Sequence, residues 1–298
     1  MARTEGYIAM DDGVRLFYEK VGDGAKTLLL LNGFYLLNDF AYLADGRTVI
    51  AVDLRNRGRS DYAADLSKMK GGVQQDADDI DIVRRHFDVG KVDLLGHSYA
   101  GIIPILYARK YPANVGRIVQ IGSMQPNQSI QYPARLTNTD SVLQEFFANF
   151  AVLQKEKETL SSQEFCAKCW RLLRPLYVFN PNDADKIRHW EFCYLPTELN
   201  LMRYWMEVLL PSIQSLDFNA EDLARVQVPV LGVHGTKDRS GPYGGGREWA
   251  LILPNARLLT LDDVAHVPWI EAPEKVYGAI KTFLDGTWPE AVEDVESL

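Results

Sequence analysis

The sequence predicts an α/β fold, in which helices flank a mostly parallel β-sheet. Continuous apolar runs at 27–31, 48–52 and 115–121 are typical of strands that are buried on both faces. Stretches at 73–87 and 102–111 place apolar residues at helical spacing, and both fall between strand-like runs. A chain of 298 residues with 47% hydrophobic content is also long enough to bury one large core.

The other elements continue this alternation along the chain. A hairpin is expected at 7–20, because two alternating segments flank Asp11, Asp12 and Gly13. The acidic tail after Gly286 is expected to be loosely held. Further strands are expected at 92–95, 230–234 and 257–261, and further helices at 246–253 and 272–284.

A long stretch in the middle of the chain departs from this alternation. Between 122 and 226 no strand-like run appears, and no internal repeat or low-complexity linker is found. Helices are expected there near 141–153, 162–173, 183–192 and 197–209.

One short motif, at 96–101, has the pattern of a nucleophilic serine. Residues 96–101 read Gly-His-Ser-Tyr-Ala-Gly and directly follow the strand expected at 92–95. A strand that turns sharply into a helix around a serine leaves the hydroxyl group exposed at the sheet edge, as a nucleophile requires. Gly96 and Ala100 suit such a turn, because larger side chains would collide there. The motif therefore predicts that Ser98 is a nucleophile.

Two further loops carry the partners that such a serine needs, a base and an acid that orients the base. Asp238 follows the strand expected at 230–234, and His266 follows the one expected at 257–261. The carboxyl ends of parallel strands lie along one edge of a sheet. We therefore predict a catalytic triad of Ser98, His266 as general base and Asp238 as acid.

Each of these residues also has a plainer interpretation. Ser98 could cap a helix, and His266 could belong to a surface loop. Asp262 and Asp263 compete with Asp238 for the role of the acid. They lie too close to His266 in sequence to face its ring from a separate loop, so Asp238 is preferred.

Several other polar residues are expected to be structural. His97 is expected to point away from the nucleophile, and His234 to pack at a strand end. Asp53, Arg55 and Arg59 are expected to hold the loop after the strand at 48–52, because charged side chains satisfy turn amides.

Five short segments stand out together. They read Leu-Asn-Gly-Phe at 31–34, Asp-Leu-Arg-Asn-Arg-Gly-Arg-Ser at 53–60, the serine turn, His-Gly-Thr-Lys-Asp at 234–238 and His-Val-Pro-Trp-Ile-Glu at 266–271. With them, residues 25–122 and 225–285 resemble the α/β-hydrolase fold superfamily. The resemblance implies a core domain with an eight-stranded-type sheet, formed by 1–122 and 226–298. It also implies a helical cap domain, inserted at 123–225 over the catalytic edge.

The resemblance also suggests where substrate binds. Two backbone N–H groups would form an oxyanion hole, that of Tyr99 at the start of a helix and that of Phe34 after the first core strand. Many relatives have His-Gly where this chain has Asn32 and Gly33. The candidate pocket residues are Gly33, Trp190, Trp205 and Trp269.

These features favour a serine hydrolase that cleaves a carboxylic ester, lactone or thioester through a Ser98 acyl-enzyme. The expected cap is rich in large apolar side chains, so a mainly apolar small molecule is the expected substrate. An iminopeptidase-like amide hydrolase stays open, because Glu191 and Glu198 could hold a substrate amine. So do a cofactor-independent lyase, an acyltransferase and a ligand receptor on the same fold. Dehalogenase and epoxide hydrolase relatives carry Asp as the nucleophile, so Ser98 disfavours them.

Composition limits the partners. The net charge of -8 and the lack of a basic run argue against binding to nucleic acid or to an anionic membrane. The first residues do not read as a signal peptide, and the longest apolar run, 28–37, is too short to span a bilayer. We expect a soluble, cytoplasmic protein that needs no cofactor, binds a small-molecule substrate and could form a homodimer.

The chain has three cysteines, which allow two interpretations. Cys166, Cys169 and Cys193 could bind zinc together with His189. Cys166 and Cys169 also fit an apolar helical pattern, which favours packing over a metal site. A disulfide is disfavoured, because a cytoplasmic location keeps thiols reduced.

Overall fold

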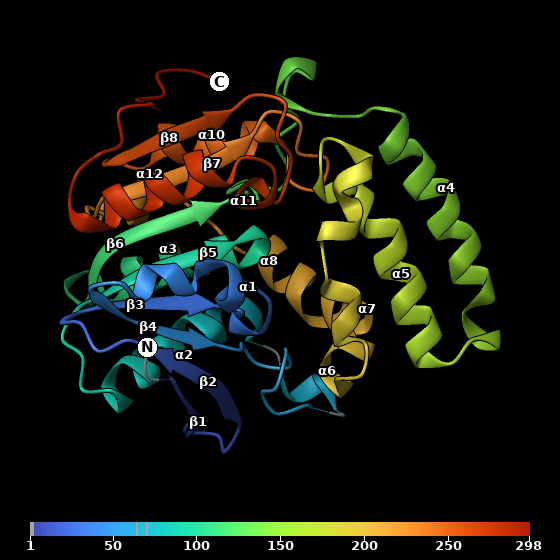
Figure 1. The fold of residues 1–298 in the computed structure, drawn as a ribbon, viewed down its shortest axis with the longest axis horizontal. Coiled ribbons are helices and arrows are strands. Elements are labelled where there is room, and N and C mark those ends of the chain that lie inside the picture. The colour runs from blue at the N-terminus through green and yellow to red at the C-terminus, as the bar shows by residue number, and fades with distance from the viewer. Residues whose placement is uncertain (1–2, 64, 70) are drawn as a thin grey trace.

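Nine strands form one sheet in the described part of the chain (Figure 1). The computed structural model describes residues 3–63, 65–69 and 71–298, without the side chains of Lys68, His189 and Trp190. Across the sheet the strands follow the order β1-β2-β4-β3-β5-β6-β7-β8-β9. Their bounds are β1 Arg3–Ala9, β2 Arg15–Val21, β3 Lys26–Leu31, β4 Arg47–Val52, β5 Val92–His97, β6 Val115–Ile121, β7 Val230–Gly235, β8 Ala256–Leu261 and β9 Val292–Glu293.

The centre of the sheet is parallel, as the continuous apolar runs predicted. Strands β4, β3, β5, β6, β7 and β8 pair in parallel, whereas β1, β2 and β9 extend the edges with antiparallel pairings. Every residue of β5 is buried, which is typical of a strand covered on both faces. The α/β fold is confirmed, with nine described strands rather than the eight-stranded type.

The tail after Gly286 is held more firmly than expected, which corrects that prediction. Strand β9 pairs with β8, and Val295 beyond it is only 8% exposed. Arg257 of β8 forms an ion pair with Asp294 of the tail, with Nε 3.0 Å from Oδ1. The tail therefore completes one edge of the sheet.

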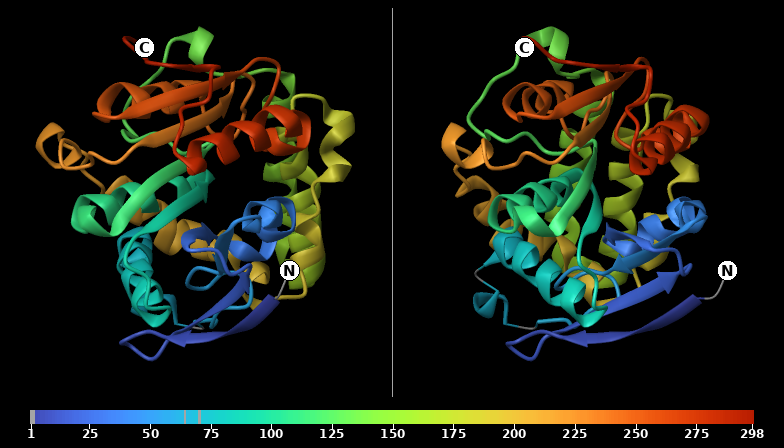
Figure 2. Two further views of the ribbon diagram at one scale, coloured as in Figure 1. Left: turned by 60° about the vertical axis from the view of Figure 1, so that its left-hand side comes forward. Right: turned by 90° about the vertical axis from the view of Figure 1, so that its left-hand side faces the viewer.

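Helices cover both faces of the sheet (Figure 2). Successive residues of a strand face opposite sides, so Leu30 of β3 packs with helices α1 and α12, whereas Leu29 packs with α2, α3 and α10. Helix α1, which the sequence patterns did not predict, begins directly after β3. The bounds are α1 Gly33–Phe40, α2 Gly72–His86, α3 Ile103–Lys110, α10 Tyr243–Ile252, α11 Pro268–Glu271 and α12 Pro273–Asp285.

We call residues 123–225 the inserted region. It lies beside the carboxyl ends of the central strands (Figure 1), and its described residues form no strand. That this region is a separate cap domain stays a prediction. Its α-helices are α4 Ser141–Glu156, α5 Ser162–Tyr177, α6 Pro196–Leu199, α7 Leu201–Tyr204, α8 Leu210–Gln214 and α9 Ala220–Leu223.

Two of the helices expected here take other forms. The segment 183–192 forms short 3₁₀ turns, Pro181–Lys186 and His189–Phe192. The Asn180 side chain accepts a hydrogen bond from the Asn182 N–H at 3.1 Å, and such local bonds compete with a regular helix. The stretch 197–209 is divided among α6, α7 and a π-helical turn, Trp205–Leu209.

The inserted region is tied to the loop that carries Asp238. Asp140 caps α4 by accepting a hydrogen bond from the Leu143 N–H at 3.3 Å. The same carboxylate accepts two hydrogen bonds from Arg239 Nε, at 3.0 and 2.8 Å. Arg239 Nη1 also donates to the Val178 carbonyl at 2.6 Å, so one buried guanidinium joins α4, the end of α5 and the acid loop.

A disulfide joins Cys166 of α5 to Cys193, which lies shortly before α6. This corrects one prediction, since a disulfide was disfavoured. It also leaves these two cysteines out of the zinc site that was the weaker alternative. Sulfurs that are bonded to each other are not available as thiolate ligands. Cys169 is a free, buried thiol whose pKa burial raises to about 11. A cytoplasmic location stays a prediction.

We expect thiol counting to test this disulfide. Protein unfolded without reductant should react at one thiol, that of Cys169, and after reduction at three. Ellman's reagent or alkylation with mass spectrometry gives the count. A Cys169→Ser control should show none before reduction. Three reactive thiols in the unreduced wild type would contradict the pairing.

In the part of the chain that the structure describes, no helix combines the length and apolar character needed to cross a bilayer.

Candidate active site

Ser98 sits at the turn between β5 and the helices that follow it. Its φ of 58° is in the left-handed region, which costs energy for a residue with a side chain and is typical of functional sites. A Cβ on Gly96 would collide with the carbonyl oxygen of Ala100, so the turn is as tight as the motif predicted. Ser98 is half-buried. The turn thus holds the hydroxyl group at the carboxyl edge of the sheet.

Asp238 and His266 meet at this same edge. His266 Nδ1 lies 2.7 Å from Asp238 Oδ2, and both residues are 1% exposed. Asp238 Oδ1 accepts hydrogen bonds from the N–H groups of Ser240 and Gly241, each at 2.8 Å. Both carboxylate oxygens are therefore engaged, and one of them faces the imidazole.

The surroundings keep Asp238 ionised. Burial alone would raise the pKa of this carboxyl, but the electrostatic interaction with His266 and hydrogen bonds from His234 and His266 hold the pKa well below its usual range. His234 Nε2 lies 3.3 Å from Asp238 Oδ2 and 3.1 Å from the Gly241 carbonyl. His234, near the end of β7, therefore does more than the strand-end packing that the sequence led us to expect. Its place four residues before Asp238 was the signal in the sequence.

His97 links the histidine loop to the nucleophile turn. Its Nε2 lies 2.9 Å from the His266 carbonyl oxygen, and its Nδ1 lies 3.0 Å from the Tyr35 hydroxyl group. The two imidazole rings are 4.5 Å apart. Because His97 directly precedes Ser98, this bond brings the main chain at 266 next to the serine. These contacts are consistent with the structural role expected for His97. That its side chain points away from the nucleophile stays a prediction.

The second ring nitrogen of His266 is buried and has no hydrogen-bond partner among the described residues. A buried polar atom without a partner is costly and calls for an explanation. No hydrogen bond joins His266 Nε2 to the Ser98 hydroxyl group in this arrangement. Catalytic hydrogen bonds often tighten only when substrate is bound, so the vacant acceptor is compatible with a general base.

The end of β6 passes close behind this pair. Gly122 has a φ of 49°, and a Cβ there would lie 3.1 Å from His266 Nδ1 and 3.3 Å from Asp238 Oδ2. Glycine satisfies both the backbone conformation and the close approach. Met124 N–H then donates to the Ser98 carbonyl at 3.2 Å, which fixes the far side of the serine turn.

The structure argues against one of the two predicted oxyanion donors. The Phe34 N–H donates to Asp53 Oδ1 at 2.7 Å, so this amide is already engaged by a buried carboxylate. That finding corrects the assignment of Phe34 to the oxyanion hole. Tyr99 follows Ser98 in the first turn of a helical segment, where N–H groups lack intrahelical partners. Its backbone N–H remains the predicted donor.

The loop after β4 is held as expected. Asp53 Oδ2 accepts from the Arg59 N–H at 2.8 Å, while Arg55 Nε and Nη2 donate to Asp79 at 2.5 and 2.9 Å. Burial raises the pKa of Asp53 to about 6, with the hydrogen bonds to Arg59 and Phe34 acting in the opposite direction. These charged side chains therefore support the loop rather than face a substrate.

The candidate pocket residues have different neighbours. The Cα of Gly33 lies against Ala51 of β4, where a Cβ would lie 2.6 Å from the alanine side chain, so packing explains this glycine. Trp205 packs edge-on to Tyr99, with the ring centres 5.9 Å apart. Trp269 contacts His97 at 4.8 Å between ring centres. The side chain of Trp190 lies outside the described residues.

A small cavity opens beside the catalytic edge. It measures ≈ 180 Å³ and is lined by Phe34, Trp269 and Phe192, with Arg188 and Glu191 among its polar residues. Trp269 therefore faces a space next to the histidine pair. Whether substrate enters there stays a prediction.

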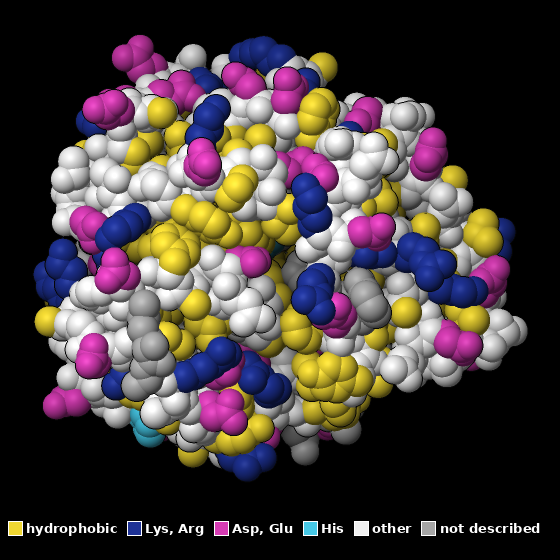
Figure 3. Space-filling view, viewed as in Figure 1, with side chains coloured by type: hydrophobic (Ala, Val, Ile, Leu, Met, Phe, Trp, Pro, Cys, Tyr) yellow, Lys and Arg dark blue, Asp and Glu magenta, His cyan; other side chains and the backbone are white. Residues whose placement is uncertain are grey.

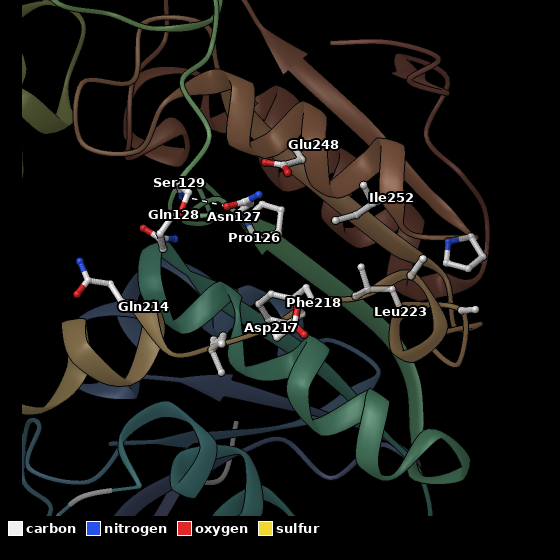
Figure 4. A pocket seen from close by; sticks show the side chains of 14 residues that line it. Pro126, Asn127, Gln128, Ser129, Gln214, Asp217, Phe218, Leu223, Glu248 and Ile252 are labelled. Carbon is white, nitrogen blue, oxygen red and sulfur yellow. Dashed lines mark hydrogen bonds between the residues drawn. The ribbon is translucent and has the colours of Figure 1, made fainter.

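A second cavity of ≈ 480 Å³ lies elsewhere, between the loop after β6 and α10 (Figure 4). Polar side chains such as Gln128 and Gln214 line one end, and Leu223 and Ile252 the other (Figure 4). None of the predicted site residues lines it. Its size alone therefore does not make it the active site.

The two acidic residues considered as an amine clamp are both engaged. Glu198 receives two hydrogen bonds from Arg57, at 2.9 and 3.2 Å, and is 2% exposed. Glu191 pairs with Arg188 at 2.7 Å. A substrate amine would have to displace a guanidinium from either one.

A serine at a strand-to-helix turn, with an Asp–His pair on neighbouring strand ends of a parallel sheet, defines the α/β hydrolase class of proteins. The family model described as "alpha/beta hydrolase fold" matches residues 26–273, and the chain belongs to this family.

Curated relatives match this chain along most of its length. The AB hydrolase superfamily protein YisY of Bacillus subtilis (strain 168) is 26% identical over 290 residues, which cover 93% of this chain and 98% of the relative. The bifunctional esterase/perhydrolase DCH of Acinetobacter calcoaceticus is 27% identical over 287 residues, 90% of this chain and 95% of the relative.

Solved structures agree on the fold. An esterase from Exiguobacterium antarcticum matches with a TM-score of 0.73 at 18% identity, over 94% of this chain and 99% of that one. At this identity the similarity shows the fold alone.

Proposed function

We propose that the protein is a serine hydrolase that cleaves a carboxylic ester, lactone or thioester of a mainly apolar small molecule. The observation that carries this proposal is the Asp238–His266 pair, with the second nitrogen of His266 buried and unpartnered beside the Ser98 turn. This arrangement supports a base that is oriented and ready to accept a proton. Curated relatives include the esterase/perhydrolase of Acinetobacter calcoaceticus, which is consistent with ester cleavage.

In the proposed mechanism, Ser98 Oγ attacks the carbonyl carbon while His266 Nε2 takes the serine proton. Asp238 holds the imidazole in the required tautomer and stabilises its protonated form. The Tyr99 N–H donates to the developing oxyanion. His266 then returns the proton to the leaving group, and water releases the acyl group from Ser98.

The surroundings of the site favour an uncharged substrate. Aromatic side chains surround His266 and its neighbour, with the Tyr177 ring centre 4.8 Å from that of His266. Phe34 and Phe192 pack edge-on at 5.0 Å beside the small cavity. Acidic and basic side chains are interspersed over the face shown in Figure 3, so this face presents no field of a single sign to steer a charged ligand.

We expect an ester to be a much better substrate than an aminoacyl amide. The kcat/KM for p-nitrophenyl butyrate should exceed that for prolyl-naphthylamide by at least about tenfold, because Arg57 and Arg188 already hold the two acidic residues considered as an amine clamp. Both rates are measured on the wild type, with Ser98→Ala as background. Faster release of naphthylamine would instead favour the iminopeptidase-like alternative. Turnover of neither substrate, nor of a lactone or thioester, would contradict the proposal.

A further inference from the structure

A buried cluster connects the inserted region to the nucleophile turn. It consists of Arg57 from the loop after β4, Glu198 of α6, Tyr99 and Asn32, and we call it the arginine cluster. Arg57 is 5% exposed, Glu198 2%, Tyr99 8% and Asn32 0%. None of these four side chains is needed to form the Asp–His pair, so their burial together calls for another explanation.

Two members of the arginine cluster bind the hydroxyl group of Tyr99. Its hydroxyl oxygen accepts a hydrogen bond from Arg57 Nη1 at 2.8 Å and another from Asn32 Nδ2 at 2.9 Å. Trp205 of the inserted region packs edge-on to the Tyr99 ring. Tyr99 directly follows Ser98. The contacts of its side chain therefore restrain the position of its backbone N–H, the predicted oxyanion donor.

The other side of Arg57 is anchored in the inserted region. Arg57 Nε and Nη2 donate to the two oxygens of Glu198, and the Gly58 N–H also donates to Glu198 Oε1 at 3.1 Å. Thr197 Oγ1 donates to the Gly58 carbonyl at 2.6 Å. The disulfide of Cys166 contacts the same helix, α6, because Cys166 Sγ lies 3.8 Å from the Glu198 carbonyl oxygen.

Arg57 stays charged in this position. Burial alone would lower its pKa, but the Glu198 carboxylate holds the pKa well above the usual value. A planar guanidinium can bond Glu198 with one edge and Tyr99 with another nitrogen, a geometry that a lysine ammonium cannot reproduce. The Arg57 guanidinium also lies over the Phe34 ring, 5.2 Å from its centre.

We propose that Arg57 is a positioning residue that couples the inserted region to catalysis. By joining Glu198 to the Tyr99 hydroxyl group, it fixes the helical turn that aims the Tyr99 N–H at the oxyanion. The inference rests on the proposed Ser98 hydrolase mechanism. It adds that the oxyanion site is complete only while α6 is docked on Arg57.

Two substitutions test this on the full-length protein, with p-nitrophenyl butyrate as the probe. Tyr99→Phe keeps the ring but removes the hydroxyl oxygen. Arg57→Lys keeps the charge but removes the guanidinium, whose Nη1 donates to Tyr99. Each should lower kcat by about 10- to 100-fold and change KM by less than about twofold, because a misplaced oxyanion donor affects the transition state more than substrate binding. Unfolding temperatures are measured in parallel, and rates are compared well below them.

The double variant separates positioning from general destabilisation. If Arg57 acts through the Tyr99 hydroxyl group, Arg57→Lys combined with Tyr99→Phe should have a kcat within about twofold of Tyr99→Phe alone. The matched control is Tyr107→Phe, which removes another largely buried hydroxyl group that donates to Asp81 at 3.0 Å. It should lower the unfolding temperature but leave kcat within about twofold of the wild type.

Three outcomes would overturn the inference. They are a Tyr99→Phe enzyme with wild-type kcat, losses in the double variant that simply multiply, or an equal loss of kcat in Tyr107→Phe. If Tyr99→Phe does not fold, Glu198→Gln replaces it, and an unchanged kcat there is equally decisive. Failure of the proposed function looks different, since the wild type itself would then neither hydrolyse the ester nor react with a fluorophosphonate.

Discussion

Ser98→Ala should lower the kcat/KM for ester hydrolysis by about 10⁴-fold or more, the largest effect that we expect from a single substitution. The serine hydroxyl group is the proposed site of the covalent intermediate, and alanine offers no atom to acylate. Labelling should disappear as well. A fluorophosphonate probe should modify the wild type at the peptide that contains residue 98, as seen by mass spectrometry, and leave the variant unmodified.

Ser129→Ala is a suitable control for this experiment. Ser129 lines the separate cavity of ≈ 480 Å³, which none of the three triad candidates lines. Both its activity and its labelling should equal those of the wild type. Labelling of Ser98→Ala at the wild-type rate would contradict the assignment of the nucleophile, and loss of activity in Ser129→Ala would direct attention to the other cavity.

Asp238→Asn should lower kcat by about 10⁴-fold while leaving the fold intact. Asp238 Oδ2 accepts a hydrogen bond from His266 Nδ1, and an amide in its place can donate to that nitrogen instead. The imidazole would then adopt the wrong tautomer, with its proton on Nε2, where the serine proton has to go. The charge that stabilises the imidazolium would also be lost. Steady-state kinetics with p-nitrophenyl butyrate measures the effect.

Asp263→Asn provides the matched control, because Asp263 was one of the two competing acids in the sequence. Its side chain is 69% exposed and lies 4.0 Å from Lys237, and its φ of 54° is readily adopted by asparagine. We expect the kcat of this variant to stay within about twofold of the wild type. A larger loss in Asp263→Asn than in Asp238→Asn would exchange the two roles.

Much of the fold was predictable because the parallel strands are buried on both faces. The apolar runs expected at 115–121 and 230–234 correspond closely to β6 and β7. The predictions failed where local pattern was short or ambiguous. Helix α1 has only eight residues, and β9 has two that depend on pairing with β8. The disulfide was missed because the expected cytoplasmic location argued against one. Its two cysteines are 27 residues apart, so no local pattern pairs them.

Some features of the candidate site could be predicted from the sequence and others could not. The serine turn is a local feature, since its glycine and alanine spacing directly reflects a tight bend, and the sequence alone predicted it. The Asp238–His266 contact was predicted from a general property of parallel sheets, that their strand ends share an edge. The commitment of the Phe34 amide to Asp53 has no local signature, because it depends on how two separate loops meet.

The sequence by itself determined the alternation of strands and helices, the strained serine turn and the order of the three triad candidates, because hydrophobic period and turn chemistry act over a few neighbouring residues. Only the tertiary structure decided which polar groups are already satisfied. Glu198 is held by Arg57, Phe34 N–H by Asp53, and His266 Nε2 by no described residue. These pairings depend on distances between segments that are remote along the chain, and such distances exist only once the chain is folded.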